Sequence, residues 1–538
     1  MTTTTQPVPS AFAPLRRPVF RMLWLAWLTA NVTMWMNEVA SAWMMTSLTD
    51  SPMMVALVQA ASTLPVFVLG LPSGALADIV DRRRYFALTQ LWVAVVAAML
   101  AMLAFVNGLT APLLLALTFA NGVGMAMRWP VFAAIVPDVV PRVDLPAAIA
   151  LNGIAMNMSR VVGPIIAGAL LASAGIPYVY MLNAVLALVA FALILRWHPE
   201  PRSSALPGER FFAAMRVGVQ HVAQSPRLRI LILRIFLFFL QSTALTALLP
   251  LVAHGFDGGD PAAYTMLLVA MGAGAIVVAL ILPWLRQRVG RDRLVYWGVG
   301  VQALASAAVV LASTMWLAVP AMVVVGMAWI STANSLTVAA QLALPNWVRA
   351  RGMSIYLMAL MGGSATGATL WGYVASATTV SASVIAAAVV GPCLMLLTRR
   401  FGRAHGGDED LSPATGNVRV PPPVIEIQPD EGPVMVTIEY LIDLEQAADF
   451  NAVMQETRRA RLRQGAVSWG LFRDTTRPGR YIEYFVDENW VEHQRRLERF
   501  TAADVGLRER RQVFHKGGEA PVVRRYVAES MRRRRPEP

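Results

Sequence analysis

The sequence predicts an all-α polytopic membrane protein of two six-helix bundles, followed by a C-terminal cytoplasmic α+β domain. Three observations carry this prediction. Of the 538 residues, 56% are hydrophobic and 15% are charged, whereas soluble proteins contain about 25% charged residues. Long apolar runs follow one another from Phe20 to about Leu397, and arginine clusters separate alternate runs. After Gly402 the composition becomes that of a linker and then of a soluble domain.

Composition also excludes several classes of protein. A disordered chain would combine low hydrophobicity with high charge, which is the reverse of this composition. A disulfide scaffold needs paired cysteines, but Cys393 is the single cysteine. The net charge of +13 comes from arginines placed between apolar runs rather than on one basic face. This distribution indicates membrane topology and excludes a nucleic-acid partner.

The apolar runs predict the positions of the helices. A helix needs about 20 apolar residues to cross a bilayer, and continuous runs favour helices over the alternating strands of a membrane barrel. We place about twelve spans at residues 20–45, 52–77, 85–106, 112–135, 147–172, 176–197, 228–252, 262–284, 293–312, 315–340, 352–376 and 380–398.

The loops between these runs predict the orientation of the protein. One set carries arginine clusters, whereas the alternate set, which we call the arginine-free loops, comprises residues 46–52, 107–111, 173–177, 254–264, 313–315 and 376–381. The positive-inside rule then places both termini in the cytoplasm, with the chain in the inner (plasma) membrane of a bacterium. No removable signal peptide precedes the first run, so we interpret that run as a retained anchor.

Internal echoes divide the chain into parts. Residues 74–84 resemble residues 283–293, and residues 135–137 resemble residues 343–345, so the six-helix halves read as parallel repeats of a transporter. We therefore expect these parts: an N-terminal cytoplasmic segment, a first bundle, a linker, a second bundle, a second linker, an α+β domain and a basic tail, at residues 1–18, 19–197, 198–227, 228–400, 401–432, 433–530 and 531–538. Within the first linker, the amphipathic stretch 210–222 predicts a helix along the membrane surface.

The last domain shows alternating and helical periods in turn. Residues 434–441, 467–473, 481–485 and 522–527 read as strands, and residues 446–462 and 488–500 read as helices. The order β-α-β-β-α-β predicts a ferredoxin-like fold.

The loop after the second run resembles the Major Facilitator Superfamily. The matching residues are Gly74, Leu76, Ala77, Asp78, Arg82 and Arg83, and the sequence departs from the family pattern at Ile79 and Asp81. Residues 137–152, 160–168 and 349–372 resemble the branch of the enterobactin exporter and the transmembrane secretion effectors. This resemblance implies proton-linked export of a small molecule, such as a siderophore or a drug-like compound, by alternating access.

Ionisable residues within apolar spans are the candidates for proton coupling, because burying them is costly. Glu38 shares one helix face with Asn31 and Trp35. Arg160 lies about 20 Å along the fifth run and Glu38 about 27 Å along the first. We expect the two to interact directly or through water; the alternative is that Arg160 only braces two helices or that Glu38 forms a structural ion pair.

Other polar residues are candidates with weaker signals. Asn152, Asn157, Gln241 and Asn334 could face a substrate or join helices by hydrogen bonds. We expect Arg128 and Arg234 to extend toward the membrane surface. Small residues, Gly163 with Gly168 and Gly363 with Gly367, predict close helix contacts.

A cytoplasmic gate is predicted at Gly74, Asp78, Arg82 and Arg83. Asp78 and Arg82 are spaced i, i+4 at the end of the second run. The resemblance implies that Asp78 caps a helix starting near Arg351 and closes the gate.

The C-terminal domain resembles the antibiotic-biosynthesis-monooxygenase type of α+β barrel through Glu483, Trp490 and His493. Such a fold would allow a homodimer. The alternative function is therefore a membrane-anchored sensor or enzyme acting through this domain. We nevertheless expect a transporter rather than an enzyme, with a small-molecule substrate, protons and the lipid bilayer as partners. We assign no catalytic residue, no metal site and no cofactor, and the sequence contains no phosphate-binding loop of the ATPase type.

Overall fold

The computed structural model describes residues 12–141, 143–198, 211–256, 261–345, 347–402 and 423–529. Its contacts define two compact units, each considered by itself here. The first comprises residues up to 206 together with 231–339 and 354–400. The second comprises residues 207–230, 340–353 and those from 401 onward.

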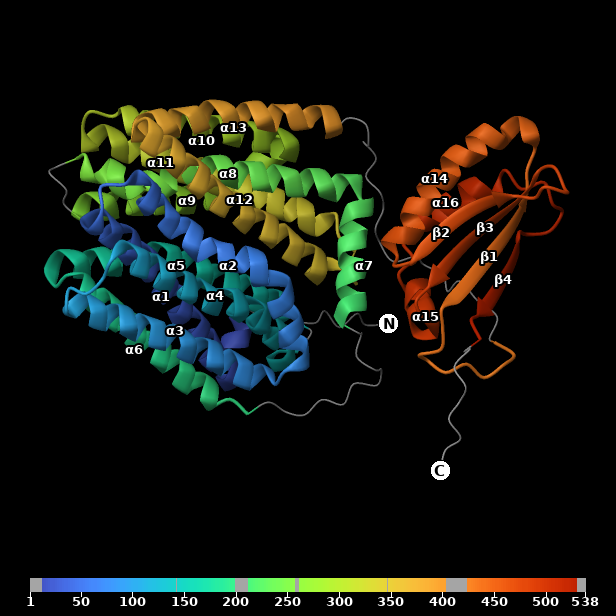
Figure 1. Cartoon of the computed structure of the whole chain (residues 1–538), viewed down its shortest axis with the longest axis horizontal. Helices are drawn as coiled ribbons and strands as arrows, with labels where there is room; N and C mark the ends of the chain where they lie inside the picture. The colour runs from blue at the N-terminus through green and yellow to red at the C-terminus, as the bar shows by residue number, and fades with distance from the viewer. Residues whose placement is uncertain are drawn as a thin grey trace, which may run out of the picture. The chain divides into compact units, whose positions relative to one another are not determined.

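Long helices build the first unit, and they form the two groups visible in Figure 1. The first group is α1 (Pro18–Leu48), α2 (Pro52–Ile79), α3 (Arg82–Phe105), α4 (Ala111–Val139), α5 (Leu145–Ser173) and α6 (Ile176–Leu195). The second is α8 (Pro226–His254), α9 (Pro261–Arg288), α10 (Arg291–Leu311), α11 (Met315–Leu342), α12 (Arg349–Ala377) and α13 (Val380–Gly402). These helices overlap the twelve predicted runs.

Ten of the described helices are long and apolar enough to cross a membrane, namely α2–α6, α8–α11 and α13. This is fewer than the predicted number of about twelve. Helix α1 falls short because Arg21, Asn31, Asn37 and Glu38 interrupt its apolar run, and α12 because arginines and small polar residues dilute it.

The sequence also explains where these helices begin. A proline lies in the first turn of α1, α2, α4, α5 and α6, where its missing N–H has no helical partner to lose. Helix α3 begins differently, because the Asp81 side chain accepts a hydrogen bond from the Arg84 backbone N–H at 2.9 Å. This cap starts α3 at Arg82, three residues before the predicted start.

Small residues allow close packing at the predicted places. A Cβ added to Gly168 of α5 would lie 2.2 Å from Thr265 Oγ1 of α9, and one added to Gly363 of α12 would lie 2.4 Å from the Phe236 carbonyl oxygen of α8. A side chain at either position would force the helices apart. Helices α5 and α9 belong to different groups, so the Gly168 contact joins the two halves of this unit.

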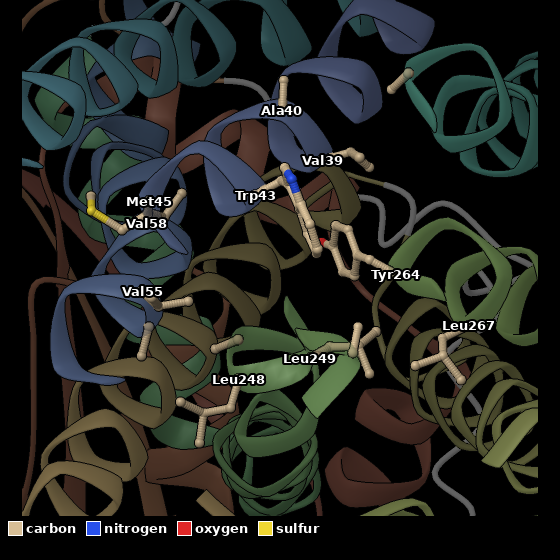
Figure 2. Packing of buried hydrophobic residues seen from close by; sticks show 14 of the residues in the cluster. Val39, Ala40, Trp43, Met45, Val55, Val58, Leu248, Leu249, Tyr264 and Leu267 are labelled. Carbon is tan, nitrogen blue, oxygen red and sulfur yellow. The ribbon is translucent and has the colours of Figure 1, made fainter. Parts of the chain in front are cut away.

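A hydrophobic cluster packs where α1, α2, α8 and α9 approach the arginine-free loops. Figure 2 shows Trp43 of α1 facing Tyr264 of α9, and their ring centroids are 5.9 Å apart. Val39, Val55 and Leu248 belong to the same buried cluster, and Val39 lies beside this pair. The cluster therefore joins the two helix groups near their arginine-free ends.

The second unit contains a four-stranded antiparallel sheet with helices (Figure 1). The strands are β1 (Val434–Leu441), β2 (Ser468–Arg473), β3 (Arg480–Asp487) and β4 (Val522–Val527), in the order β2-β3-β1-β4. Helix α14 (Ala447–Arg463) lies between β1 and β2 in the chain. Val434 pairs with Asp487 of β3 and with Val527 of β4, so β1 is central.

The predicted second helix of this domain, residues 488–500, corresponds to α15 (Trp490–Glu498), and a further helix that we did not predict, α16 (Ala502–Gln512), follows it. Thr501 and Asp504 form a capping box, with each side chain accepting the other's backbone N–H. Because this motif starts a new helix, the chain turns between Arg499 and Thr501 instead of continuing one helix.

Helix α7 (Phe211–Gln224) belongs to the second unit and overlaps the predicted amphipathic stretch. Gln220 donates a hydrogen bond to the Ala466 carbonyl at 2.8 Å, and the His221 ring bonds the Arg463 carbonyl at 3.1 Å. Trp347, which precedes α12, meets the His221 ring edge to face with centroids 5.4 Å apart, and the Arg499 guanidinium lies over its ring. The polar side of α7 therefore contacts protein. Its predicted placement on a membrane surface stays a prediction.

Candidate functional site

A cavity of about 300 Å³ lies within the first unit, between the two groups of helices. Its lining comes from four helices of the first group (α1, α2, α4 and α5) and four of the second (α8, α9, α11 and α12). The lining positions fall near the middle of most of these helices. A largely apolar cavity of this size with a few polar groups is the usual form of a small-molecule site.

Aromatic and sulfur-containing side chains make up much of this lining. They are Trp35, Trp129, Trp329, Phe239, Tyr264, Met34, Met125, Met156, Met271 and Met361. Flexible methionines and flat aromatic rings adapt to apolar ligands of varied shape.

Glu38 and Arg160 are the acidic and the basic side chain among the described lining residues. Gln59 supplies a hydrogen bond to the Glu38 carboxylate. Each charge lies in the electrostatic field of the other, yet within the described residues no direct ion pair joins them. Two opposite charges thus face one cavity without closing on each other.

The guanidinium of Arg160 lies between two tryptophans. Its central carbon is 3.8 Å from the ring centroid of Trp329 and 5.2 Å from that of Trp35. Such cation–π contacts contribute roughly 0.5–2 kcal/mol each. They hold the guanidinium at the cavity wall.

The structure brings four of the predicted membrane residues together around this cavity: Glu38, Arg160, Trp35 and Asn157. The other four lie elsewhere. Asn31 is buried and donates to the Trp27 carbonyl at 2.7 Å. Gln241 donates to Gln302 Oε1 at 2.6 Å. Asn152 and Asn334 are not among the lining residues, and Asn334 is exposed.

Two arginines that we expected to extend toward the membrane surface are buried instead. Arg128 is 1% exposed, and it donates to the Ala30 carbonyl at 2.7 Å and lies over the Trp27 ring. Arg234 is 6% exposed and donates to Asp292, Tyr296 and Thr398. The expectation was wrong because a carbonyl and an aromatic ring hold the Arg128 guanidinium, whereas two hydroxyl groups and the Asp292 carboxylate hold that of Arg234.

The predicted gate residues separate in the structure. Arg82 belongs to α3 rather than α2 and pairs with Asp138 near the end of α4. Arg83 donates to the Leu195 carbonyl of α6. Gly74 lies in α2 with the Pro130 side chain nearby, whereas the Asp78 side chain lies outside the described residues. Arg82 therefore lies outside the helix that contains Asp78, since the Asp81 cap starts a new helix between them, and the gate role of these residues stays a prediction.

Buried charges in the C-terminal domain are paired. Glu483 accepts hydrogen bonds from Arg461 Nε at 3.0 Å, Tyr440 Oη at 3.0 Å and Trp469 Nε1 at 3.2 Å. Burial raises the pKa of Glu483, but Arg461 and Arg511 outweigh burial and bring this pKa below its ordinary value. This carboxylate therefore stays charged and holds β3 to α14.

A second network contains the predicted His493. Asp487 accepts from His493 Nδ1 at 2.8 Å and from Arg496 Nε at 2.9 Å. Burial raises the pKa of Asp487, but Arg496 and His493 together bring it below its ordinary value. Trp490 packs against the His493 ring with centroids 5.3 Å apart. Within the described residues, no three histidine, cysteine or acidic side chains form a group that could hold a metal ion.

Several cavity residues escaped sequence reasoning. Gln59, Tyr264 and Trp329 come from α2, α9 and α11, far apart in the chain. Gln59 is a polar residue in an apolar run, which is a weak signal. Tyr264 and Trp329 gave no signal in the sequence, because aromatic residues are common at lipid-facing and core positions alike.

Comparison with known proteins relates the chain to transporters. Over 270 residues it is 22% identical to the staphyloferrin A transporter of Staphylococcus aureus, a match covering 49% of this chain and 66% of that protein. Over 267 residues it is 24% identical to the macrolide efflux protein A of Streptococcus pyogenes, with 49% and 65% covered. The chain thus spans just under two thirds of these relatives' length.

Solved structures share the fold. The nucleoside transporter NupG matches with a TM-score of 0.57 and 14% identity, over 71% of this chain and 99% of that one. A bacterial homologue of the human lysosomal transporter Spinster, in an inward-facing and occupied conformation, matches with a TM-score of 0.60 and 16% identity, over 73% and 98%.

One family model spans nearly the whole sequence. It describes the transmembrane secretion effectors and matches residues 9–534, which include the C-terminal domain. No separate family identifies that domain. With the two helix groups and the cavity between them, this match is decisive: the chain belongs to the transmembrane secretion effector family of the Major Facilitator Superfamily, whose members are transporters.

Proposed function

We propose that the protein exports a small amphipathic molecule in exchange for protons, by alternating access. The cavity carries this proposal, because it opens between two helix groups and contains one carboxylate, Glu38, among apolar walls. A carboxylate in such a place can bind and release a proton during a transport cycle. The relatives named for staphyloferrin A and for macrolides support a siderophore or drug-like substrate.

The arginine pattern supports a placement in the inner membrane of a bacterium, with both termini in the cytoplasm. Export is then movement from the side of the arginine-bearing loops to the side of the arginine-free loops. We also keep the predicted domain bounds and the gate at Gly74, Asp78, Arg82 and Arg83 as parts of this proposal.

Transport in proteoliposomes tests the proposal. Vesicles containing the full chain are loaded in turn with a macrolide, staphyloferrin A and the fluorescent amino acid Nε-dansyl-lysine, and flux is measured with and without a pH gradient. We expect gradient-driven flux of at least one compound, and we expect Glu38→Gln to abolish it. Asp50→Asn is the matched control, since it removes a carboxylate from the exposed loop after α1.

The outcomes separate the parts of the proposal. If flux through the wild type does not depend on the pH gradient, the proposed coupling to protons is wrong. Gradient-driven flux that survives in Glu38→Gln would move the coupling site to another residue. No flux of any compound would favour the rival function, a sensor or enzyme in the C-terminal domain.

For the C-terminal domain we propose pairing with a second copy of the chain. The sheet face formed by Met435, Phe472, Tyr484 and Tyr526 supports this, because Phe472 is 60% exposed and stacks on Tyr484. Exposed aromatic residues on one face are typical of an interface. The mass of the full chain in nanodiscs tests the proposal: we expect a dimer that Phe472→Arg converts to a monomer. A monomeric wild type would contradict it.

A further inference from the structure

Arg160 presents hydrogen-bond donors that the described protein does not use. Its guanidinium lies over the rings of Trp329 and Trp35, and these cation–π contacts provide no lone-pair acceptor for its N–H groups. No described side chain or carbonyl accepts from these groups. Arg160 is partly exposed and lines the cavity, so its edge is accessible to a ligand there.

Glu38 presents the opposite chemistry in the same cavity. Its carboxylate accepts a hydrogen bond from Gln59, and an ionised carboxylate has room for about four. Arg160 attracts Glu38 without a direct ion pair. One negative and one positive group therefore face a shared space without forming a direct ion pair among the described residues.

Nearby donors add to this pattern. The indole N–H groups of Trp35 and Trp129, both cavity residues, are buried without an acceptor. They lie among apolar walls that include Phe239, Met271 and Leu360. A ligand that fits these walls has an apolar body. To satisfy the polar groups, the same ligand needs a hydrogen-bond acceptor and a cationic group.

We infer that the substrate class of this cavity is an amphipathic zwitterion. Its anionic group, such as a carboxylate, binds the edge of Arg160, and its cationic group, such as an ammonium, binds Glu38. Two opposite charges with unused hydrogen-bonding capacity disfavour neutral ligands and ligands with a single charge. This inference rests on the proposed role of the cavity as the transport site.

The inference also explains how a substrate and a proton would exchange. An ammonium group and a proton compete for the same carboxylate, Glu38. Protonation of Glu38 then releases the cationic end of the substrate, whereas Arg160 stays charged throughout and holds the anionic end.

Four matched probes test the assignment: Nε-dansyl-lysine, its methyl ester, its Nα-acetyl derivative and its Nα-acetyl methyl ester. They share one apolar body and carry both charges, the cation alone, the anion alone and neither. Binding to the full chain in nanodiscs is measured at equilibrium by energy transfer from tryptophan to the dansyl group. No gradient is applied, so the result does not depend on transport.

We expect each matching charge to strengthen binding about tenfold. Arg160→Gln should remove the advantage of the carboxylate and keep that of the ammonium. Glu38→Gln should do the reverse. The neutral probe should bind both variants as it binds the wild type, which shows that the cavity is intact, and Asp50→Asn should change nothing.

Three results would overturn the inference. They are equal affinities of the four probes for the wild type, undetectable binding of Nε-dansyl-lysine, and an equal loss for all probes in Arg160→Gln. The last is what a residue that only braces Trp35 and Trp329 would give. A binding pattern as expected without gradient-driven flux would instead refute the proposed function and leave the zwitterion site in place.

Discussion

The cavity and the C-terminal domain treat buried charge in opposite ways. In the cavity, Glu38 and Arg160 share a space but form no direct ion pair among the described residues. In the C-terminal domain, Glu483 lies 3.0 Å from Arg461, and Asp487 lies 2.9 Å from Arg496. Both carboxylates there are at most 1% exposed.

The difference separates structural charges from charges available to a ligand. Leaving a buried charge unpaired is costly, so a fold keeps one where the charge has another use. In the C-terminal domain Glu483 also accepts hydrogen bonds from two neutral donors, Tyr440 and Trp469, and Asp487 accepts one from His493. Donors from the protein occupy both of these carboxylates. In the cavity, Glu38 and Arg160 keep hydrogen-bonding capacity that a substrate can use.

The largest effect should come from breaking a complete network. Arg461→Met leaves Glu483 buried without its hydrogen-bonded cation, and losing one partner of a buried pair costs about 3–5 kcal/mol. We expect residues 434–527 of the full chain to lose most of their protection from hydrogen exchange. Arg510→Met is the control, since its pair with Glu456 is half exposed and such pairs contribute about 0–1 kcal/mol. Equal protection in both variants would contradict the comparison.

Acidification should weaken the contact of α7 within the second unit. Burial lowers the pKa of His221 to about 4, against a small opposing effect of its bond to the Arg463 carbonyl. The neutral ring is therefore favoured in the fold, and this stability is complete above pH 6.5 and declines as the pH falls toward 4. The slope is at most about 1.4 kcal/mol per pH unit.

Hydrogen exchange of α7 between pH 7 and pH 4.5 measures this effect, with rates corrected for intrinsic pH dependence. The wild type should open more readily as the pH falls, and His221→Gln should show a flatter profile. A steep profile in the variant would show that groups other than His221 cause the pH dependence.

Features that depend on residues close together in the sequence could be predicted, whereas features that depend on tertiary packing could not. Periodicity predicted the positions of the long helices and, to the residue, the strands 434–441 and 522–527, because both patterns are local. The turn between α15 and α16 is also local, but the capping box of Thr501 and Asp504 was overlooked. The surroundings of Glu38 could not be predicted, because Gln59 and Tyr264 reach it only through tertiary packing.

Asn31 shows the same limit from the other side. It shares a helix face with Glu38, as the spacing requires, but its side chain bonds the Trp27 carbonyl and accepts from Arg128 of α4. The sequence gives the face of one helix. Which neighbour meets that face depends on the packing of all the others.

A smaller effect is expected from the partly exposed pair that links α7 to the loop after β3. Arg216 lies 2.6 Å from Glu488, and the side chains are 40% and 31% exposed. Arg216→Gln should therefore weaken the contact by about 0–1 kcal/mol, and salt should reduce that difference further. Exchange rates of α7 at low and high salt test this, and an effect as large as that of Arg461→Met would contradict the distinction between exposed and buried pairs.

The smallest effect on stability should come from the cavity carboxylate itself. Glu38→Gln keeps the shape of the side chain and removes a charge that no direct ion pair compensates. We therefore expect the free energy of unfolding of the full chain to fall by less than about 1 kcal/mol or to rise. The same substitution is expected to abolish gradient-driven flux. Glu38→Gln would therefore lose transport and keep its stability, whereas Arg461→Met would lose stability. Thermal unfolding in nanodiscs decides this. A loss of several kcal/mol in Glu38→Gln would mean that Glu38 holds the helices together as Glu483 holds its domain, and the contrast between the two regions would fail.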